Sequence, residues 1–471
     1  MSNGRGELRP YQLQAVEDIR LALKDQGSAV YQLATGAGKT VVGGEVGRRV
    51  TDRGNQALFL VHRRELVTQT IDTIQDMIPG LSIGVEARGW PAMPWAPLQI
   101  GMVQTMVRRE STLRPRIIIV DEAHHVRTKS WETILGRYPD AWILGLTGTP
   151  QRLDGKGLGT HFRILVQGPT IPDLVGMGYL APVRTLRLPA ALKLSGVKKD
   201  RRGEYDRGEA QRRLDEKVIA DTTASYLRYA RGRRAMFFGI TREHSRRVCA
   251  SLRAVGVSAE HVDGDDHDSR RDRIMAGLRD GALDVVGNCD LISEGFDAPG
   301  CDCILMGSHT ASVTRYLQQA GRAMRPHPTD PTREALILDL AGISHDLGLP
   351  DEIRDWSLED GEVNEREKGK RILKTCPVCR TGFYGNRCKH CGHQLAAPMP
   401  DVAEVDTELE EATPTIDHKK TLRQQVGMCK NAPNPRACLE AIAKARKYKA
   451  GWVDHVLGAW ERSGQLKEAR R

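Results

Sequence analysis

Seven consecutive residues have the composition of a loop that wraps a phosphate group: Ala34-Thr35-Gly36-Ala37-Gly38-Lys39-Thr40. Glycine has no Cβ, so the backbone there can turn successive N–H groups toward one anion. In such a loop the Lys39 amine reaches the β- and γ-phosphate oxygens, and the Thr40 hydroxyl ligates Mg²⁺. Leu33 stands where the strict pattern has its first glycine. We expect Thr35 to Thr40 to bind a nucleoside triphosphate.

A pair of carboxylates follows a strongly apolar run later in the chain. Asp121 and Glu122 come directly after Ile117–Val120 and open the tetrapeptide Asp121-Glu122-Ala123-His124. Such a run predicts a buried parallel strand, and α/β sheets bind ligands at the carboxyl ends of their strands. We expect Asp121 to hold the Mg²⁺ ion and Glu122 to orient and deprotonate the attacking water. A solvated turn is the alternative interpretation.

A third polar segment supplies positive charge, in the order Gln318-Gln319-Ala320-Gly321-Arg322-Ala323-Met324-Arg325. Arg322 and Arg325 are three residues apart, which on a helix places them on one face. There they could meet the γ-phosphate as arginine fingers, and Gln318 completes the predicted catalytic set. An ordinary basic helix would show the same spacing, so the prediction depends on the two preceding segments.

Short apolar runs alternate with helix-like stretches up to about residue 345. Runs that are apolar throughout indicate parallel strands covered on both faces, hence an α/β fold. The expected strands are Val30–Leu33, Ala57–Val61, Ile117–Val120, Ile143–Leu146, Ala235–Phe238, Val257–His261, Asp284–Val286, Cys303–Met306 and Leu336–Leu338. The phosphate loop would then join a strand to a helix, whose N-terminal dipole favours the phosphates.

The length of 471 residues suits about three domains. Residues 398–416 combine prolines with acidic residues, which is typical of a flexible linker. We expect a first α/β domain at 1–168, an inter-domain segment and the start of the second domain at 169–225, the second α/β domain at 226–345, a charged connector at 346–375, a zinc ribbon at 376–393, an acidic linker at 394–430 and a helical C-terminal module at 431–471.

The formal net charge of +10 suits a polyanionic partner, although a merely basic surface would give the same number. The longest apolar runs are too short to cross a bilayer, and the N-terminal residues lack the apolar core of a signal peptide. We therefore expect a cytoplasmic protein with no membrane partner.

Four of the ten cysteines form two CxxC pairs separated by eight residues. The two pairs, Cys376/Cys379 and Cys388/Cys391, match a closed tetrahedral Zn²⁺ site, and redox pairs are the competing interpretation. Gly382 and Gly392 are expected to form the knuckle turns. Basic residues in the module could contact nucleic acid, or the module could only brace the rest of the protein; these residues are Arg380, Arg387 and Lys389. The other cysteines are expected to be reduced, buried and apolar in role.

The C-terminal segment predicts two short helices. Asn434-Pro435 is a helix start, and Trp452, Val456 and Trp460 fall on one face of a second helix. We interpret this face as a small core in preference to a base-stacking surface. We also expect Trp90 and Trp95, in a proline-rich loop, to pack rather than to stack on bases.

Taken in order, these segments resemble the motifs of superfamily 2 helicases of the DEAD/DEAH-box type, over residues 7 to 345. The resemblance is closest to RadD-like and related phage ATP-dependent helicases, which share the zinc cysteines. Besides the three segments above, the matching motifs are Arg9-Pro10-Tyr11-Gln12, Leu60-Val61-His62-Arg63-Arg64-Glu65-Leu66, Val103-Gln104-Thr105, Thr147-Gly148-Thr149-Pro150, Phe237-Phe238-Gly239 and Ser293-Glu294-Gly295-Phe296-Asp297.

The resemblance implies two tandem RecA-like domains with ATP between them, followed by the zinc ribbon and the helical segment. It implies that Gln12 reads the adenine and that Arg9, His124, Gly295 and Asp297 also belong to the nucleotide site. It further implies contacts to the backbone of a single strand, for which the candidates are Arg63, Arg64, Gln104, Thr105, Arg242 and Arg315.

The expected activity is therefore that of an ATP-dependent helicase or translocase using ATP, Mg²⁺ and Zn²⁺. We expect single-stranded or forked DNA as the substrate, a role in repair, recombination or replication, and replication or repair proteins as partners of the C-terminal module. The alternatives are an RNA helicase, the motor subunit of a restriction system, and a zinc-bearing nucleic-acid adaptor with an ATP switch. A complete hydrolytic set, Glu122 with Arg322 and Arg325, argues against a pure adaptor.

Overall fold

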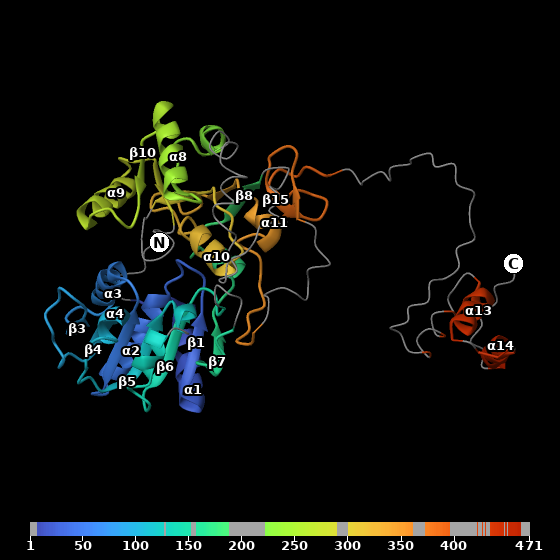
Figure 1. Cartoon of the computed structure of the whole chain (residues 1–471), viewed down its shortest axis with the longest axis horizontal. Coiled ribbons are helices and arrows are strands. Elements are labelled where there is room, and N and C mark those ends of the chain that lie inside the picture. The colour runs from blue at the N-terminus through green and yellow to red at the C-terminus, as the bar shows by residue number, and fades with distance from the viewer. Residues whose placement is uncertain are drawn as a thin grey trace. The chain divides into compact units, whose positions relative to one another are not determined.

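A computed structural model describes residues 7–126, 129–151, 157–187, 222–289, 300–360 and 373–395, positions 422, 426 and 429, and residues 434–462 except 447 and 450. The chain divides into two compact units, Met1–Ala396 and Ala397–Arg471. The larger unit contains two parallel sheets and a small two-stranded sheet, and the smaller one contains α13 and α14 (Figure 1).

The first sheet has the strand order β3-β4-β2-β5-β6-β1-β7, and each neighbouring pair is parallel. We call this sheet and its helices the first lobe. Its strands are β1 (Ser28–Gln32), β2 (Gln56–Val61), β3 (Ile83–Glu86), β4 (Leu98–Met102), β5 (Pro115–Asp121), β6 (Trp142–Thr147) and β7 (Ile164–Gln167). Its helices are α1 (Pro10–Gln26), α2 (Lys39–Thr51), α3 (Arg64–Met77), α4 (Val103–Met106), the 3₁₀ turn η1 (Ala123–His125), α5 (Lys129–Leu135) and α6 (Ile171–Gly176).

Successive side chains of the central strands pack into cores on opposite faces of the first sheet. In β2, Phe59 packs into the core that α1, α2 and α3 cover, whereas Leu58 and Leu60 pack into a separate core with α4 and α5. Successive side chains of a strand point to opposite faces, so a strand buried on both sides must be apolar at every position. The continuous apolar runs in the sequence reflect this requirement.

The second sheet has the order β10-β11-β9-β12-β13-β8, and it is parallel too. We call it and its helices the second lobe. Its strands are β8 (Val183–Arg187), β9 (Arg234–Phe238), β10 (Ala259–Val262), β11 (Val285–Asn288), β12 (Cys301–Met306) and β13 (Ala335–Asp339). Its helices are the π-helical turn η2 (Tyr226–Ala230), α8 (Arg242–Ala254), α9 (Asp268–Asp280), α10 (Val313–Gly321) and α11 (Ile343–Leu347). Two tandem parallel α/β lobes confirm the expected RecA-like pair.

The cysteine-rich module follows the second lobe. Its two strands, β14 (Leu373–Thr375) and β15 (Gly382–Tyr384), pair antiparallel, and Cys376 and Cys388 are buried beside Phe383. The expected role of Gly382 in the first knuckle turn is wrong. Arg380 takes the left-handed conformation there, with φ of 63°, whereas Gly382 lies in β15 where a Cβ would come 2.7 Å from Arg187 Cδ.

The smaller unit contains the two predicted helices, α13 (Pro435–Ala445) and α14 (Trp452–Arg462). The Asn434 side chain caps α13 by accepting a hydrogen bond from the Ala437 N–H at 3.1 Å. Trp460 is buried, and Trp452 and Val456 pack on the same cluster, as expected of a small core. One expectation is wrong: Cys429 and Cys438 are not reduced but are joined in a disulfide, with their Cα atoms 5.5 Å apart.

Candidate active site between the two lobes

The phosphate loop lies between β1 and α2, where the sequence predicts it. Gly36 and Gly38 have φ angles of 85° and 92°, in the left-handed region that residues with a Cβ rarely adopt. Lys39 begins α2 and is only 8% exposed, with its amine 3.3 Å from the Leu33 carbonyl oxygen inside the loop. Thr40 follows in the first turn of α2. The loop thus gathers a buried cation and the N–H groups of a helix start at one point.

The start of α1 packs directly on this loop. Gln12 is buried, its side-chain oxygen accepts from the Arg9 N–H at 2.9 Å, and a Cβ at Gly38 would come 2.6 Å from its amide nitrogen. The Tyr11 hydroxyl donates to the Ala37 carbonyl oxygen at 2.6 Å. Burial raises the pKa of Tyr11, so it stays a donor at neutral pH. Gln12 therefore borders the phosphate loop.

Tyr179 adds an aromatic surface to this end of the loop, which sequence reasoning missed. The Arg9 guanidinium lies over its ring at 4.4 Å, and the Tyr11 ring lies 5.3 Å from it. Tyr179 is 168 positions beyond Tyr11 and belongs to no motif, so no local signal could have placed it here. A planar base could be held at this cluster of two rings and a guanidinium.

The two carboxylates lie at the carboxyl end of β5, the central strand next to β6 and β2. Asp121 ends the strand and is 6% exposed, and its carboxylate accepts from the Glu122 N–H at 3.0 Å. Glu122 has φ of 47°, a left-handed conformation that costs a non-glycine residue free energy. Such strain is found at functional sites.

Polar contacts connect Glu122 to the second lobe. His124 Nδ1 lies 3.3 Å from Glu122 Oε2 and 3.2 Å from Thr147 Oγ1. The Thr147 hydroxyl donates to the Thr149 carbonyl oxygen at 2.8 Å. The Thr149 hydroxyl in turn donates to the Thr314 hydroxyl, on α10, at 2.7 Å. Sequence analysis placed Thr147 and Thr149 in a motif but did not identify Thr314 as the partner across the cleft.

Residues of α10 and the turn after it reach the phosphate loop. The Gln318 amide donates to Glu122 Oε2 at 3.3 Å. A Cβ at Gly321 would come 2.7 Å from Thr35 Cβ, and a Cβ at Gly36 would come 3.3 Å from Arg325 Cγ. The lobes are therefore in contact at the loop. This cleft brings Gln318 and Arg325 to the first-lobe residues, as the sequence predicts.

The expectation that Arg322 and Arg325 share one helix face is wrong. α10 ends at Gly321, Arg322 is its C-terminal cap, and Arg325 lies in the segment beyond. Gly321, the last residue of α10, packs closely on Thr35 of the first lobe. Arg322 is 7% exposed, whereas Arg325 is partly exposed.

The first-lobe candidates for binding a strand lie at the carboxyl ends of neighbouring strands. Arg63 and Arg64 are at the start of α3, directly after β2, and the Arg64 guanidinium lies 4.9 Å from the Trp90 ring centre. Gln104, on α4 after β4, donates to the His62 carbonyl oxygen at 2.8 Å, and Thr105 follows it. Trp90 packs as expected, but the expectation for Trp95 is wrong, because Trp95 is 68% exposed.

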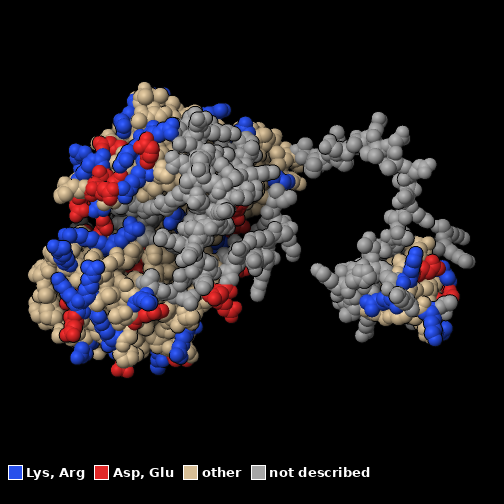
Figure 2. Space-filling view, in the orientation of Figure 1, with Lys and Arg blue, Asp and Glu red and all other residues tan. Residues whose placement is uncertain are grey.

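The second-lobe candidates are less uniform. Arg242 starts α8 and is paired with Asp265, whereas Arg315 lies in the first turn of α10. A contact that sequence analysis missed joins the lobes on this side, where Arg271 of α9 lies 3.5 Å from Glu65 of α3. Figure 2 shows Lys and Arg side chains mixed with acidic ones over α3 and α9. Gly295 and Asp297 lie outside the described residues.

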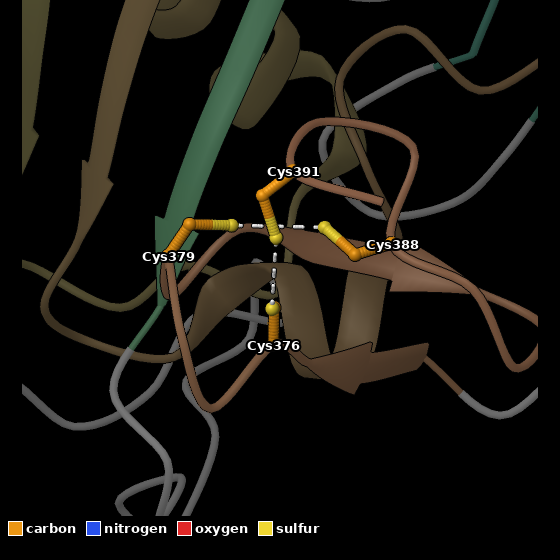
Figure 3. Close-up of side chains that lie close together, drawn as sticks. All are labelled: Cys376, Cys379, Cys388 and Cys391. Carbon is orange, nitrogen blue, oxygen red and sulfur yellow. Dashed lines mark hydrogen bonds between the residues drawn. The ribbon is translucent and has the colours of Figure 1, made fainter. Parts of the chain in front are cut away.

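The four CxxC cysteines point their sulfurs at one another (Figure 3). All four sulfurs lie within 4.8 Å of one another, and the pairs Cys376–Cys391 and Cys379–Cys388 are each 3.6 Å apart. Four sulfurs at about 2.3 Å from a zinc ion in a tetrahedron are about 3.8 Å apart. The donor set and its spacing fit Zn²⁺.

Comparison with known proteins gives independent evidence for the family of this chain. The family model "Type III restriction enzyme, res subunit" matches residues 5–152, and "Helicase conserved C-terminal domain" matches residues 218–327. A 51.5 kDa protein of a Lactococcus phage is 31% identical, over 78% of this chain and 78% of its own length. The chain belongs to superfamily 2 of the helicases. It is accordingly an ATP-dependent helicase, and helicases use ATP and Mg²⁺.

Two other known proteins are similar to this chain over part of their own length. A Schizosaccharomyces pombe protein provisionally named mitochondrial ATP-dependent helicase irc3 is 28% identical over 71% of this chain, which spans only 57% of that relative's length. The structure of an ATP-dependent Type ISP restriction-modification enzyme bound to DNA has the same fold, with a TM-score of 0.55 and 17% identity over 72% of this chain and 28% of the enzyme. The finer resemblance to RadD-like helicases stays a prediction.

One negative finding concerns membranes. Among the described residues, no helix combines the length and the apolar character needed to cross a bilayer.

Proposed function

We propose that this helicase hydrolyses ATP in the cleft described above and uses the energy to move along DNA. The observation that supports the catalytic part most directly is the 3.3 Å contact of Gln318 with Glu122, because it joins the two lobes at one carboxylate. A site built from both lobes changes when the lobes separate, which is what a motor requires.

In the first lobe, Lys39 and the N–H groups of the phosphate loop would hold the phosphates, and Gln12 with Arg9 would hold the adenine. Thr40 and Asp121 would hold Mg²⁺, which neutralises charge on the phosphates when bound. Glu122 would orient the attacking water and take its proton. His124, 3.3 Å from Glu122 Oε2, would keep that carboxylate in position.

In the second lobe, Arg322 and Arg325 would stabilise the negative charge that develops on the γ-phosphate, and Gln318 would position Glu122. Arg325 already packs against Gly36 of the phosphate loop. The hydrogen bond between the Thr149 and Thr314 hydroxyls would transmit a change at the γ-phosphate from the first lobe to α10. Roles for Gly295 and Asp297 in the nucleotide site remain predictions from sequence.

The nucleic-acid path would run over the carboxyl ends of the strands, with Arg63, Arg64, Gln104 and Thr105 on the first lobe and Arg242 and Arg315 on the second. These groups suit phosphates, which give affinity without sequence preference. DNA is supported by the solved restriction-modification enzyme of the same fold, which is bound to DNA. We propose single-stranded or forked DNA, in repair, recombination or replication, with the helical C-terminal unit contacting partner proteins.

The decisive experiment compares the ATPase rate with single-stranded DNA, duplex DNA, forked DNA and RNA in parallel. Stimulation by single-stranded or forked DNA above that by RNA of matched length supports the proposal. Stimulation by RNA alone would replace it with an RNA helicase. Binding of DNA with no turnover of ATP would favour the adaptor.

The motor subunit of a restriction system is a second candidate, because the first-lobe family model carries that description. Cleavage of circular duplex DNA in the presence of ATP, by this chain with its co-expressed partners, would favour it. ATP consumption that leaves the circle intact would favour the helicase.

We further propose that Cys376, Cys379, Cys388 and Cys391 hold one structural Zn²⁺. Four thiolates close the coordination sphere, so the metal would act on folding of the module and not on substrate.

A further inference from the structure

The cysteine-rich module is docked on the edge of the second sheet. β8 is the last strand of that sheet, and Leu186 pairs with Thr381 of the module in an antiparallel bridge. The Arg187 N–H donates to the Arg380 carbonyl oxygen at 3.2 Å, and Arg184 donates to Thr381 Oγ1 at 3.1 Å. The module thereby covers an exposed sheet edge, and its backbone is fixed relative to the second lobe.

A segment between the second lobe and the module crosses to the first lobe. We call residues 348–360 the strap. At its start, the Gly348 carbonyl oxygen accepts from the Tyr316 hydroxyl of α10 at 3.0 Å. At its end, the Leu358 carbonyl oxygen accepts from the Gly159 N–H at 2.8 Å, and the Leu358 side chain packs on the first-lobe core. The strap is thus attached to both lobes.

The middle of the strap is held from the module. The Tyr384 hydroxyl, at the end of β15, donates to Glu352 Oε2 at 3.0 Å. Burial and the neighbouring Glu352 carboxylate raise the pKa of Tyr384 to about 12, so the hydroxyl keeps its proton at neutral pH. Gly348 has φ of 73°, and a Cβ there would collide with the Glu352 carboxylate, so the turn is shaped around this contact.

Arg354 makes the same stretch rigid. It is 7% exposed and donates to four backbone carbonyl oxygens of the segment around it, at distances from 2.8 to 3.4 Å. A guanidinium with several carbonyl partners and no room to move fixes the backbone that carries those carbonyls.

The strap also forms one wall of a cavity beside the phosphate loop. Glu352, Ile353, Arg354 and Trp356 line this cavity together with Ala34, Thr35, Gln318 and Gly321. The wall therefore lies next to the loop and the α10 residues to which the catalytic roles are assigned above. A displacement of the strap would change the shape of the nucleotide cleft.

From these contacts we propose that Tyr384 and Glu352 are positioning residues for the nucleotide site. The module, folded around its metal and docked on β8, holds the strap through this hydrogen bond and so sets the cleft wall beside the phosphate loop. The inference rests on the proposed ATP and zinc sites. It assigns the module a bracing role at the cleft, the second of the two alternatives that the sequence leaves open.

The test uses the full chain and the variant Tyr384→Phe, which removes one hydroxyl and no metal ligand. We expect zinc content to stay at the wild-type value and the Kd of a fluorescent, non-hydrolysable ATP analogue to rise about threefold to tenfold. This is less than the full value of a hydrogen bond to a charged group, because the contact acts on the cleft only through the strap. The KM for ATP should rise with the Kd, while kcat at saturating ATP stays within about twofold. Hydrogen exchange of amides 349–360 should accelerate.

Three further variants separate positioning from general damage. Glu352→Ala should reproduce Tyr384→Phe, and the double variant should be no worse than either single change. Glu352→Gln keeps an acceptor oxygen and should stay near wild type. Tyr226→Phe is the matched control, because it loses one hydroxyl bond of 2.9 Å to a carbonyl oxygen within the second lobe, away from the strap.

The inference is overturned if Tyr384→Phe and Glu352→Ala, with zinc retained, leave analogue affinity and strap exchange unchanged. It is equally overturned if Tyr226→Phe gives the same effects. Neither result touches the proposed function, which is tested separately by the dependence of ATP turnover on the phosphate loop and on the nucleic acid supplied.

Discussion

The side-chain amide of Gln318 lies 3.3 Å from a carboxylate oxygen of Glu122, although the two residues belong to different lobes and are 196 positions apart. Glu122 is itself held in a left-handed backbone conformation, and His124 contacts the same oxygen at 3.3 Å. The Glu122 carboxylate is thus contacted by a residue of each lobe. It has both contacts only while the lobes lie together. If Glu122 is the catalytic base proposed above, hydrolysis depends on the relative position of the lobes.

Glu122→Gln should separate binding from turnover. The amide keeps the size of the side chain but accepts no proton, so we expect kcat for ATP to fall by about 10² to 10⁴. Affinity for the ATP analogue should stay within about twofold, because Glu122 is not assigned to holding phosphate. Single-turnover hydrolysis and analogue titration measure the two quantities. ATPase activity at the wild-type level would exclude Glu122 as the base.

Lys39→Ala should abolish hydrolysis by a different route, through loss of the buried amine beside the phosphate loop. We expect the ATPase rate to fall to background and analogue binding to weaken strongly, since the amine is assigned to the β- and γ-phosphates. Lys24→Ala, on the exposed side of α1, is the matched control and should leave both measurements unchanged. Wild-type turnover in Lys39→Ala would refute the assignment of the loop.

The sequence predicts the central strands well because they are buried on both faces. Strands that mix polar with apolar residues escape this rule: β3, β4 and β8 are of this kind, and none of them is found by searching for apolar runs. The end of α10 also escapes it, since Gly321 ends the helix against Thr35, a residue of the other lobe. Nothing local to Gly321 records that contact.

In the candidate site, too, local sequence locates some residues and misses those that arrive from distant segments. Motif residues such as Lys39 and Asp121 can be located by their neighbours in sequence, because a loop and the strand or helix beside it form one local unit. Tyr179, Thr314 and Tyr384 belong to the site region only through packing between distant segments. The disulfide of Cys429 likewise follows from the fold of its unit, because a spacing of nine residues in sequence indicates no bond.

Gly321→Ala should weaken nucleotide binding by pushing the lobes apart. The new Cβ would come 2.7 Å from Thr35 Cβ, and overpacking of this kind costs about 1–3 kcal/mol. We expect the KM for ATP to rise at least about fivefold. Gly176→Ala, at a helical position with nothing within 4 Å, is the matched control and should be neutral or slightly stabilising. Equal KM values for the two variants would argue against lobe contact at Gly321 in solution.

Loss of the metal should unfold the cysteine-rich module. A module with a core of three buried residues, Cys376, Phe383 and Cys388, has little else to hold it together. We expect about one zinc per chain by metal analysis, and rapid hydrogen exchange of residues 373–395 in Cys391→Ser. Exchange in β1 and β5 should remain slow. Wild-type protein purified with no bound metal, and with protected module amides, would contradict the zinc assignment.

Arg64→Ala tests the proposed nucleic-acid path, and Arg116→Ala is its matched control. Arg64 lies over Trp90 at the carboxyl edge of the first sheet, and Arg116 makes the same kind of contact, at 4.5 Å from the Trp142 ring centre, near the amino end of β5. If Arg64 binds a phosphate, its loss should weaken binding to all DNA sequences alike. The slope of log affinity against log salt should then fall by about one.

Arg116→Ala removes a cation–π contact of equal kind without reaching the proposed path, so it should leave DNA affinity and its salt slope at the wild-type values. Fluorescence anisotropy of labelled single-stranded DNA at several salt concentrations measures both variants. If both lose affinity to the same extent, only general positive charge matters, and the path over α3 is wrong. A loss confined to Arg64→Ala ties the strand to the edge of the sheet that also carries the phosphate loop and Glu122.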